Sequence, residues 1–196
     1  DEIRNENPDY VSQLAFLSEE GFPFYHNTGF EYYAPCENGF DVMLNELKKA
    51  EKFIFMEYFI IEEGIMFNSI LSILEEKVKQ GVEVRIMYDD MGSLGTLPAS
   101  YAKQLEKKGI KAVSFNRISP IINTIMNHRD HRKILVIDGR VAFSGGANLA
   151  DEYINKKVKY GHWMDNIICI KGKAVWSYLV MFLTNWNALR HEDEDY

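Results

Sequence analysis

Apolar and polar positions follow two different periods along this 196-residue chain. Several segments repeat apolar side chains with the helical period, and we expect helices at 40–51, 65–79, 98–108 and 174–189. Short apolar runs between them predict strands at 52–61, 82–88, 110–115 and 164–170. Two further runs, 134–137 and 141–143, flank an Asp-Gly pair and predict an antiparallel hairpin. This alternation favours an α/β fold, with a mixed β-sheet flanked by helices on both faces.

The two ends of the chain lack this pattern. Residues 1–24 are predicted to be a polar lead-in segment, with a short helix at most. Residues 25–190 are predicted to form one domain. The acidic residues 191–196 then form a tail or a linker. Because the chain starts with Asp1 rather than Met, we expect it to be a piece of a longer protein.

The composition is that of a soluble globular domain, with 46% hydrophobic and 26% charged residues. No apolar run approaches the ~20 residues that span a bilayer. The net charge of −7 argues against a general nucleic-acid binder, so no nucleic-acid partner is expected. An anionic substrate stays compatible with this charge, because the local field at a site matters more than the total.

Charge is concentrated where the first strand of the hairpin begins. Every residue from 128 to 133 is ionisable, although an apolar run follows directly. Side chains alternate across a strand, so His131 and Lys133 are predicted to point to one face. A two-residue loop at 138–139 places Lys133 opposite Ser144, and a loop at 139–140 places it opposite Gly146.

Either pairing predicts that His131, Lys133, Ser144, Gly146 and Asn148 share one face of the hairpin. Asn148 is also a candidate N-cap of a short helix whose first turn contains two acidic residues, Asp151 and Glu152. A helix N-terminus offers free N–H groups to an anion. The combination would suit a phosphate group: a cation neutralises it, donors orient it and a histidine reacts with it.

Each of these residues also has a purely structural explanation. An Asp-Gly pair favours a turn, which accounts for Asp138 without any chemistry. Asn148 alone is a cap, and Gly145-Gly146 alone is a bulge or a bend. His128, Asp130 and His131 form an incomplete set of metal ligands in one short stretch, so no metal site is predicted.

The spacing His131-x-Lys133-x4-Asp138-x6-Gly145-Gly146-x-Asn148 resembles the HKD motif of the phospholipase D superfamily. The stretch "HRDHRKILVIDGRVAFSGGANLADEY" is similar to the first HKD segment of bacterial cardiolipin synthases. The segments "EYFII", "GVEVRIMYDDMGS" and "HWMDNIICIKG" resemble that family in the same order. The resemblance covers roughly residues 25–190 and implies a phospholipase D-like half.

The resemblance implies phosphodiester transfer without a metal or cofactor. Two HKD histidines cooperate: one forms a phosphohistidine, and the other protonates the leaving oxygen. Cardiolipin synthases convert two phosphatidylglycerol molecules to cardiolipin and glycerol. The implied catalytic residues are those that name the motif, His131, Lys133 and Asp138, although the parity of Asp138 indicates a structural role in the hairpin.

The resemblance assigns further residues to the same site. It implies phosphate binding by Lys133, Asn148 and Ser144, with Asp165 accepting a hydrogen bond from His131 and fixing its tautomer. Gly145 and Gly146 support the site. Glu57 and the loop 89–93 are candidates to line the pocket, with ordinary strand and loop roles as the alternative.

The chain carries one HKD motif, so a complete site requires a second half. A C-terminal domain of the parent protein or a homodimer partner would supply it, and we expect the isolated chain to be inactive. The resemblance places the parent at the bacterial cell membrane, with this domain on the cytoplasmic side. Two alternatives remain: a homodimeric phosphodiesterase or nuclease, and a non-catalytic module that binds anionic lipid through "KKVK" at 156–159.

Overall fold

The computed structural model describes residues 10–116 and 129–190 and contains a mixed seven-stranded sheet in the order β1-β7-β6-β5-β2-β3-β4. Strands β2, β3 and β4 are parallel to one another, and every other neighbouring pair is antiparallel. The strands are β1 Thr28–Tyr33, β2 Phe53–Tyr58, β3 Glu83–Asp89, β4 Lys111–Phe115, β5 Lys133–Ile137, β6 Val141–Gly145 and β7 Ile167–Gly172.

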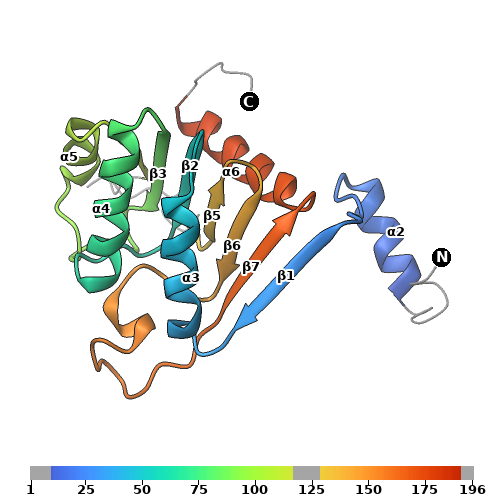
Figure 1. Ribbon diagram of the computed structural model, residues 1–196, viewed down its shortest axis with the longest axis horizontal. Coiled ribbons are helices and arrows are strands. Elements are labelled where there is room, and N and C mark those ends of the chain that lie inside the picture. The colour runs from blue at the N-terminus through green and yellow to red at the C-terminus, as the bar shows by residue number, and fades with distance from the viewer. Residues whose placement is uncertain (1–9, 117–128, 191–196) are drawn as a thin grey trace, which may run out of the picture.

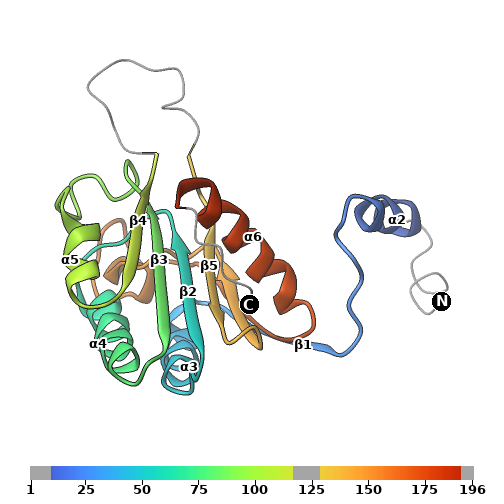
Figure 2. The same cartoon turned by 90° about the horizontal axis from the view of Figure 1, so that it is seen from above.

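Helices cover both faces of this sheet, as the sequence predicted. Figure 2 shows α3, α4 and α5 on one side and α6 alone on the other. Their bounds are α3 Glu37–Lys48, α4 Ile65–Lys79, α5 Tyr101–Lys107 and α6 Val175–Leu189. A short 3-10 helix, η3, spans Asp151–Ile154. Within residues 10–116 and 129–190, no helix is long and apolar enough to cross a membrane.

Two hydrophobic cores lie on the two faces of the sheet. Strand β2 is buried along its whole length because it contributes to both. Ile54 and Met56 belong to the core beneath α3 and α4, whereas Phe53 and Phe55 belong to the core beneath α6. This double burial explains why the sequence of β2 is almost continuously apolar.

The N-terminal part differs partly from prediction. Helix α2, Val11–Glu19, matches the short helix expected in the lead-in segment, contains no buried residue and lies apart from the sheet (Figure 1). Strand β1 was missed by the periodicity argument. It is an edge strand whose middle residues are all exposed, so it lacks the buried alternation that identifies a strand.

The hairpin is real, but both predicted registers are wrong. Ile137 pairs with Val141, so three residues rather than two connect β5 to β6. Asp138 and Gly139 both adopt positive φ, at 53° and 63°. Ser144 consequently pairs with Ile134 and shares its face, which is the opposite face to that of Lys133.

Candidate active site

One end of the sheet gathers most of the predicted site residues. Lys133, the first residue of β5, pairs with Tyr58, the last residue of β2. At the same end, Gly145 closes β6 opposite Ile167, which opens β7. The strand ends and the loops that leave them therefore bring together six predicted residues: His131, Lys133, Gly145, Gly146, Asn148 and Asp165.

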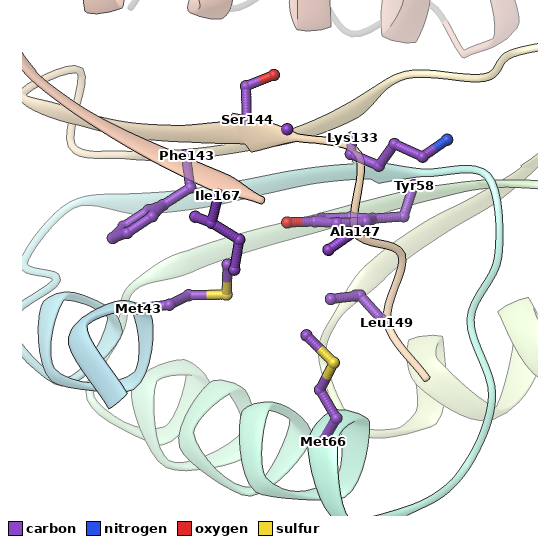
Figure 3. A pocket seen from close by; sticks show the side chains of 10 residues that line it. Met43, Tyr58, Met66, Lys133, Phe143, Ser144, Ala147, Leu149 and Ile167 are labelled. Atoms are coloured by element: carbon purple, nitrogen blue, oxygen red, sulfur yellow. The ribbon is translucent and has the colours of Figure 1, made fainter. Parts of the chain in front are cut away.

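Lys133 is buried at this end, with only 5% of its surface exposed. Its Nζ donates to the carbonyl oxygen of His131 at 2.6 Å and lies 5.4 Å from the centre of the Phe59 ring. Burial lowers the pKa of Lys133 to about 8, although the negative charges of Asp130 and Asp165 act to raise it. Figure 3 shows the side chain above a small hollow lined by Tyr58 and Met66.

The ring of His131 is exposed and packs against Phe59, with 4.8 Å between ring centres. The predicted hydrogen bond from His131 to Asp165 is absent among the described residues. The carboxylate of Asp165 instead accepts from the backbone N–H of Asn166 at 2.8 Å and from the indole of Trp163 at 3.4 Å. Asp165 thus accepts hydrogen bonds from its near neighbours in the chain, and this structure does not show it as the partner of His131.

Gly145 and Gly146 allow the end of β6 to lie very close to the residues that precede β7. Gly145 has a φ of 154°, and a Cβ there would lie 2.3 Å from the carbonyl oxygen of Asn166. A Cβ on Gly146 would lie 2.1 Å from a carboxylate oxygen of Asp165. Both contacts are too short for any side chain, so the supporting role predicted for the two glycines has a steric basis.

Asn148 is buried and anchors the loop after β6. Its Oδ1 accepts from the N–H of Ile60 at 3.0 Å, and its Nδ2 donates to the Tyr153 hydroxyl at 2.8 Å. The predicted N-cap role is wrong, because η3 begins after Ala150 and no side chain caps it. The nearby Asp151 caps α4 instead, accepting from the first backbone N–H groups of that helix.

Two predicted residues have side chains that do not join this cluster. Ser144 is on the α6 face, and its hydroxyl points away from the hollow in Figure 3, so the predicted shared face is wrong for this residue. Asp138 lies at the opposite end of β5. Its carboxylate accepts from the N–H groups of Glu51, Lys52 and Phe53, which ties the hairpin to β2. This position is structural, so Asp138 does not belong with the catalytic residues.

Phe59 was not predicted and proves central to the site. It contacts both His131 and Lys133, and the adjacent Ile60 holds Asn148. Its own carbonyl oxygen packs so closely on Gly92 that a Cβ there would lie 2.2 Å away. The sequence signal was an aromatic residue directly after a buried strand, but only the fold shows what it touches.

Buried acids surround the segment that leads into β5. Asp89 accepts from the backbone N–H of Asp130 at 3.1 Å, and Glu57 accepts from Arg132 at 3.3 Å and Asn185 at 2.8 Å. Burial and the nearby Asp130 carboxyl raise the pKa of Glu57, and the contacts with Asn185 and Arg132 partly offset this shift. Glu57 therefore fixes the segment from beneath and does not line the site.

The metal-site question involves His128, which lies outside the described residues. Within residues 10–116 and 129–190, no group of three His, Cys, Asp or Glu side chains could hold a metal ion.

Comparison with known proteins agrees with this geometry. The chain is 54% identical over 174 residues to an uncharacterised protein of Streptococcus mutans, covering 89% of the chain and 38% of that protein. It is 36% identical over 174 residues to a cardiolipin synthase of Oceanobacillus iheyensis, covering 87% and 36%. The chain thus spans little more than a third of the length of these relatives.

A solved structure shares the fold. Nuc from Salmonella typhimurium, a phospholipase D family member, superimposes with a TM-score of 0.62 at 21% identity, covering 84% of this chain and 97% of that one. Residues 43–181 match the family model described as "Cardiolipin synthase, PLD-like domain". The resemblance stated from the HKD motif is confirmed: the chain belongs to the cardiolipin synthase family of phospholipase D-like domains.

Proposed function

We propose that this chain forms one half of an active site that transfers a phosphatidyl group between two phosphatidylglycerol molecules, giving cardiolipin and glycerol. The observation that carries the proposal is the buried ammonium of Lys133 beside His131, at the sheet end where the motif's glycines let the end of β6 pack closely against Asp165 and Asn166. Family membership supports the substrate class. The second half comes from the parent chain.

The reaction needs two histidines with complementary protonation. A neutral imidazole is a suitable nucleophile toward a phosphodiester anion. One imidazole nitrogen bonds to phosphorus while the bond to the glycerol oxygen breaks, and the other histidine gives that oxygen a proton. The hydroxyl of the second phosphatidylglycerol then attacks phosphorus, the P–N bond breaks, and the second histidine recovers a proton. His131 takes one of these two parts.

Lys133 and Asn148 stabilise the phosphoryl oxygens in this proposal. The ammonium of Lys133 has three hydrogens, of which one is used by the carbonyl oxygen of His131. The amide of Asn148 has a second hydrogen beyond the one given to Tyr153. Charge-stabilising donors in a partly desolvated site contribute more than they would in water.

The test uses the full-length parent protein with labelled phosphatidylglycerol in the presence of a chelator. We expect cardiolipin and glycerol in equal amounts, and we expect His131→Ala to lower turnover by at least about 10³-fold. A chemically trapped phosphohistidine should be lost in one of the two single-histidine variants. Cardiolipin formation that survives His131→Ala would sink the proposal.

A second candidate is a phosphodiesterase or nuclease that acts as a homodimer. It is favoured by the mutual coverage of this chain and Nuc, which match over 84% and 97% of their lengths. Light scattering separates the two candidates. A monomer that cleaves neither a chromogenic phosphodiester nor DNA rules out the homodimeric enzyme.

A further inference from the structure

We propose that residues 156–162, together with Met164, form a docking surface for an anionic phospholipid bilayer. These residues connect η3 to β7, and we call residues 156–162 the lysine loop. The inference rests on the proposed function, because it assigns the membrane contact of the same site. It concerns how the protein reaches its lipid, and not how the phosphate reacts.

The lysine loop exposes large apolar side chains to an unusual degree. Val158 and Tyr160 are each 83% exposed, and Met164 is 73% exposed. Lysines at 156, 157 and 159 lie next to Val158 and Tyr160, and residues 155–164 contain no acid. In a chain of net charge −7, this is a local reversal of sign. Cations next to apolar and aromatic side chains suit the boundary between lipid headgroups and acyl chains.

Hydrogen bonds between the two residues that flank the lysine loop hold its base in place, so the fold fixes where its exposed side chains lie. The N–H of Trp163 donates to Asn155 Oδ1 at 2.7 Å, and Asn155 Nδ2 donates to the Trp163 carbonyl oxygen at 3.1 Å. The indole packs on Tyr153 at 5.0 Å between ring centres, and Tyr160 packs on the indole at 6.2 Å. The loop would therefore lose little conformational freedom when its exposed side chains bind a bilayer.

Two of the lysines are tied back to the domain. Lys157 pairs with Glu62 at 2.6 Å and Lys159 with Glu152 at 2.7 Å. Their side chains are still 50% and 39% exposed. Lys156 forms no ion pair within the described part of the chain. We therefore expect the apolar side chains to supply most of the binding and the lysines to supply the preference for anionic lipid.

The lysine loop also lies at the end of the sheet that carries the candidate active site. Figure 1 shows the segment between β6 and β7 beyond the end of β1 and the start of α3. Tyr153, which supports Trp163, accepts the hydrogen bond from Asn148. A bilayer that contacts the loop is thus adjacent to the proposed phosphate position.

A protein partner fits this surface less well. Lysine is depleted in the cores of protein–protein interfaces, whereas here three of the four residues 156–159 are lysines. The same pattern complements a negatively charged membrane surface.

The test measures binding of the chain to vesicles of phosphatidylglycerol and phosphatidylcholine, with pure phosphatidylcholine vesicles for comparison. The variant V158S/Y160S should bind the anionic vesicles about tenfold more weakly or worse. Lys156→Gln should reduce the preference for anionic over neutral vesicles several-fold, and 0.5 M salt should do the same to the wild type.

Matched control variants distinguish binding through this surface from non-specific adsorption to vesicles. Tyr32→Ser removes an aromatic residue that is 59% exposed on β1, and Lys103→Gln removes an exposed lysine on α5; both should bind as the wild type does. His131→Ala should also bind normally, so a failure of the catalytic proposal stays distinguishable. The inference is overturned if the wild type ignores anionic vesicles, or if V158S/Y160S binds them as well as Tyr32→Ser does.

Discussion

At the scale of single residues, the crowded charges before β5 have separate tasks. Asp130 and Arg132 make the contacts with buried acids, through the N–H of Asp130 to Asp89 and the guanidinium of Arg132 to Glu57. His131 and Lys133 instead share the ring of Phe59. From Asp130 to Lys133, the anchoring residues and the proposed catalytic residues therefore alternate along the chain.

The lowered pKa of Lys133 gives the proposed reaction an alkaline limit. With a pKa of about 8, the ammonium is present below that pH and is progressively lost above it. We expect kcat/KM of the full-length enzyme to fall above about pH 8, because kcat/KM reports ionisations of the free enzyme. Lys133→Arg should be slower but should keep its activity to higher pH, since a guanidinium stays charged.

The measurement is a pH–rate profile of phosphatidylglycerol turnover for the wild type and Lys133→Arg. An alkaline limb at the same pH in both proteins would show that another group causes it. Lys103→Arg, at an exposed position on α5, is the matched control and should leave the profile unchanged.

Sequence reasoning recovered part of the site for a clear physical reason. His131 and Lys133 are close in the chain, so a local pattern was enough to associate them. Phe59 and Tyr153 come from other segments, and their contacts depend on the fold. The hydroxyl of Ser144 was misplaced because a connection longer by one residue moves a side chain to the other face.

At the scale of elements, the β5–β6 hairpin is held to β2 by Asp138. Burial opposes ionisation of its carboxyl, but the N–H groups of Phe53, Lys52 and Glu51 outweigh that effect and lower the pKa. These bonds lie at the end of β5 opposite to Lys133. They fix the register of β5 along β2, and so they determine which residue of β2 lies opposite Lys133 at the other end.

Replacing Asp138 should therefore cost stability. We expect Asp138→Ala to lower the free energy of unfolding by about 2–3 kcal/mol, because backbone donors lose their acceptor and alanine tolerates positive φ poorly. Asp138→Asn should cost about 1 kcal/mol, since asparagine accepts a positive φ and keeps one oxygen. Urea unfolding monitored by tryptophan fluorescence measures both.

The pH dependence provides a second check on Asp138. A carboxyl whose pKa is lowered by folding stabilises the native state above its unfolded pKa, and that contribution is lost as the pH falls. The difference between the wild type and Asp138→Asn should shrink below about pH 4. A difference that stays constant from pH 7 to pH 3 would contradict the assigned hydrogen bonds.

The helices and central strands were predictable because their apolar side chains repeat with a clear period. The hairpin register was not, since an Asp-Gly pair fits connections of two or three residues. Strand β1 escaped detection because Phe30 and Tyr32 are 75% and 59% exposed, so its sequence shows no buried face.

At the scale of the whole molecule, the described fold presents one HKD motif, whereas the related cardiolipin synthase is far longer than this chain. We expect the isolated chain to show no phosphatidyl transfer. Mixing it with the separately produced remainder of its parent should restore activity, with a rate that saturates as either part is increased. Thin-layer chromatography of labelled lipid measures this. Turnover by the chain alone would contradict the two-half arrangement.

The pairing of β1 with β7 has a consequence for how the chain folds as it is made. Thr28 pairs with Gly172, and among the described strands β7 is the one neighbour of β1. At ≈ 5–20 residues per second, a ribosome needs on the order of 10 s to add the intervening chain. Throughout that time β1 can have no partner in the sheet, and Phe30 and Tyr32 stay available to chaperones. Strand β1 is thus made before the other six described strands and is among the last of them to join the sheet.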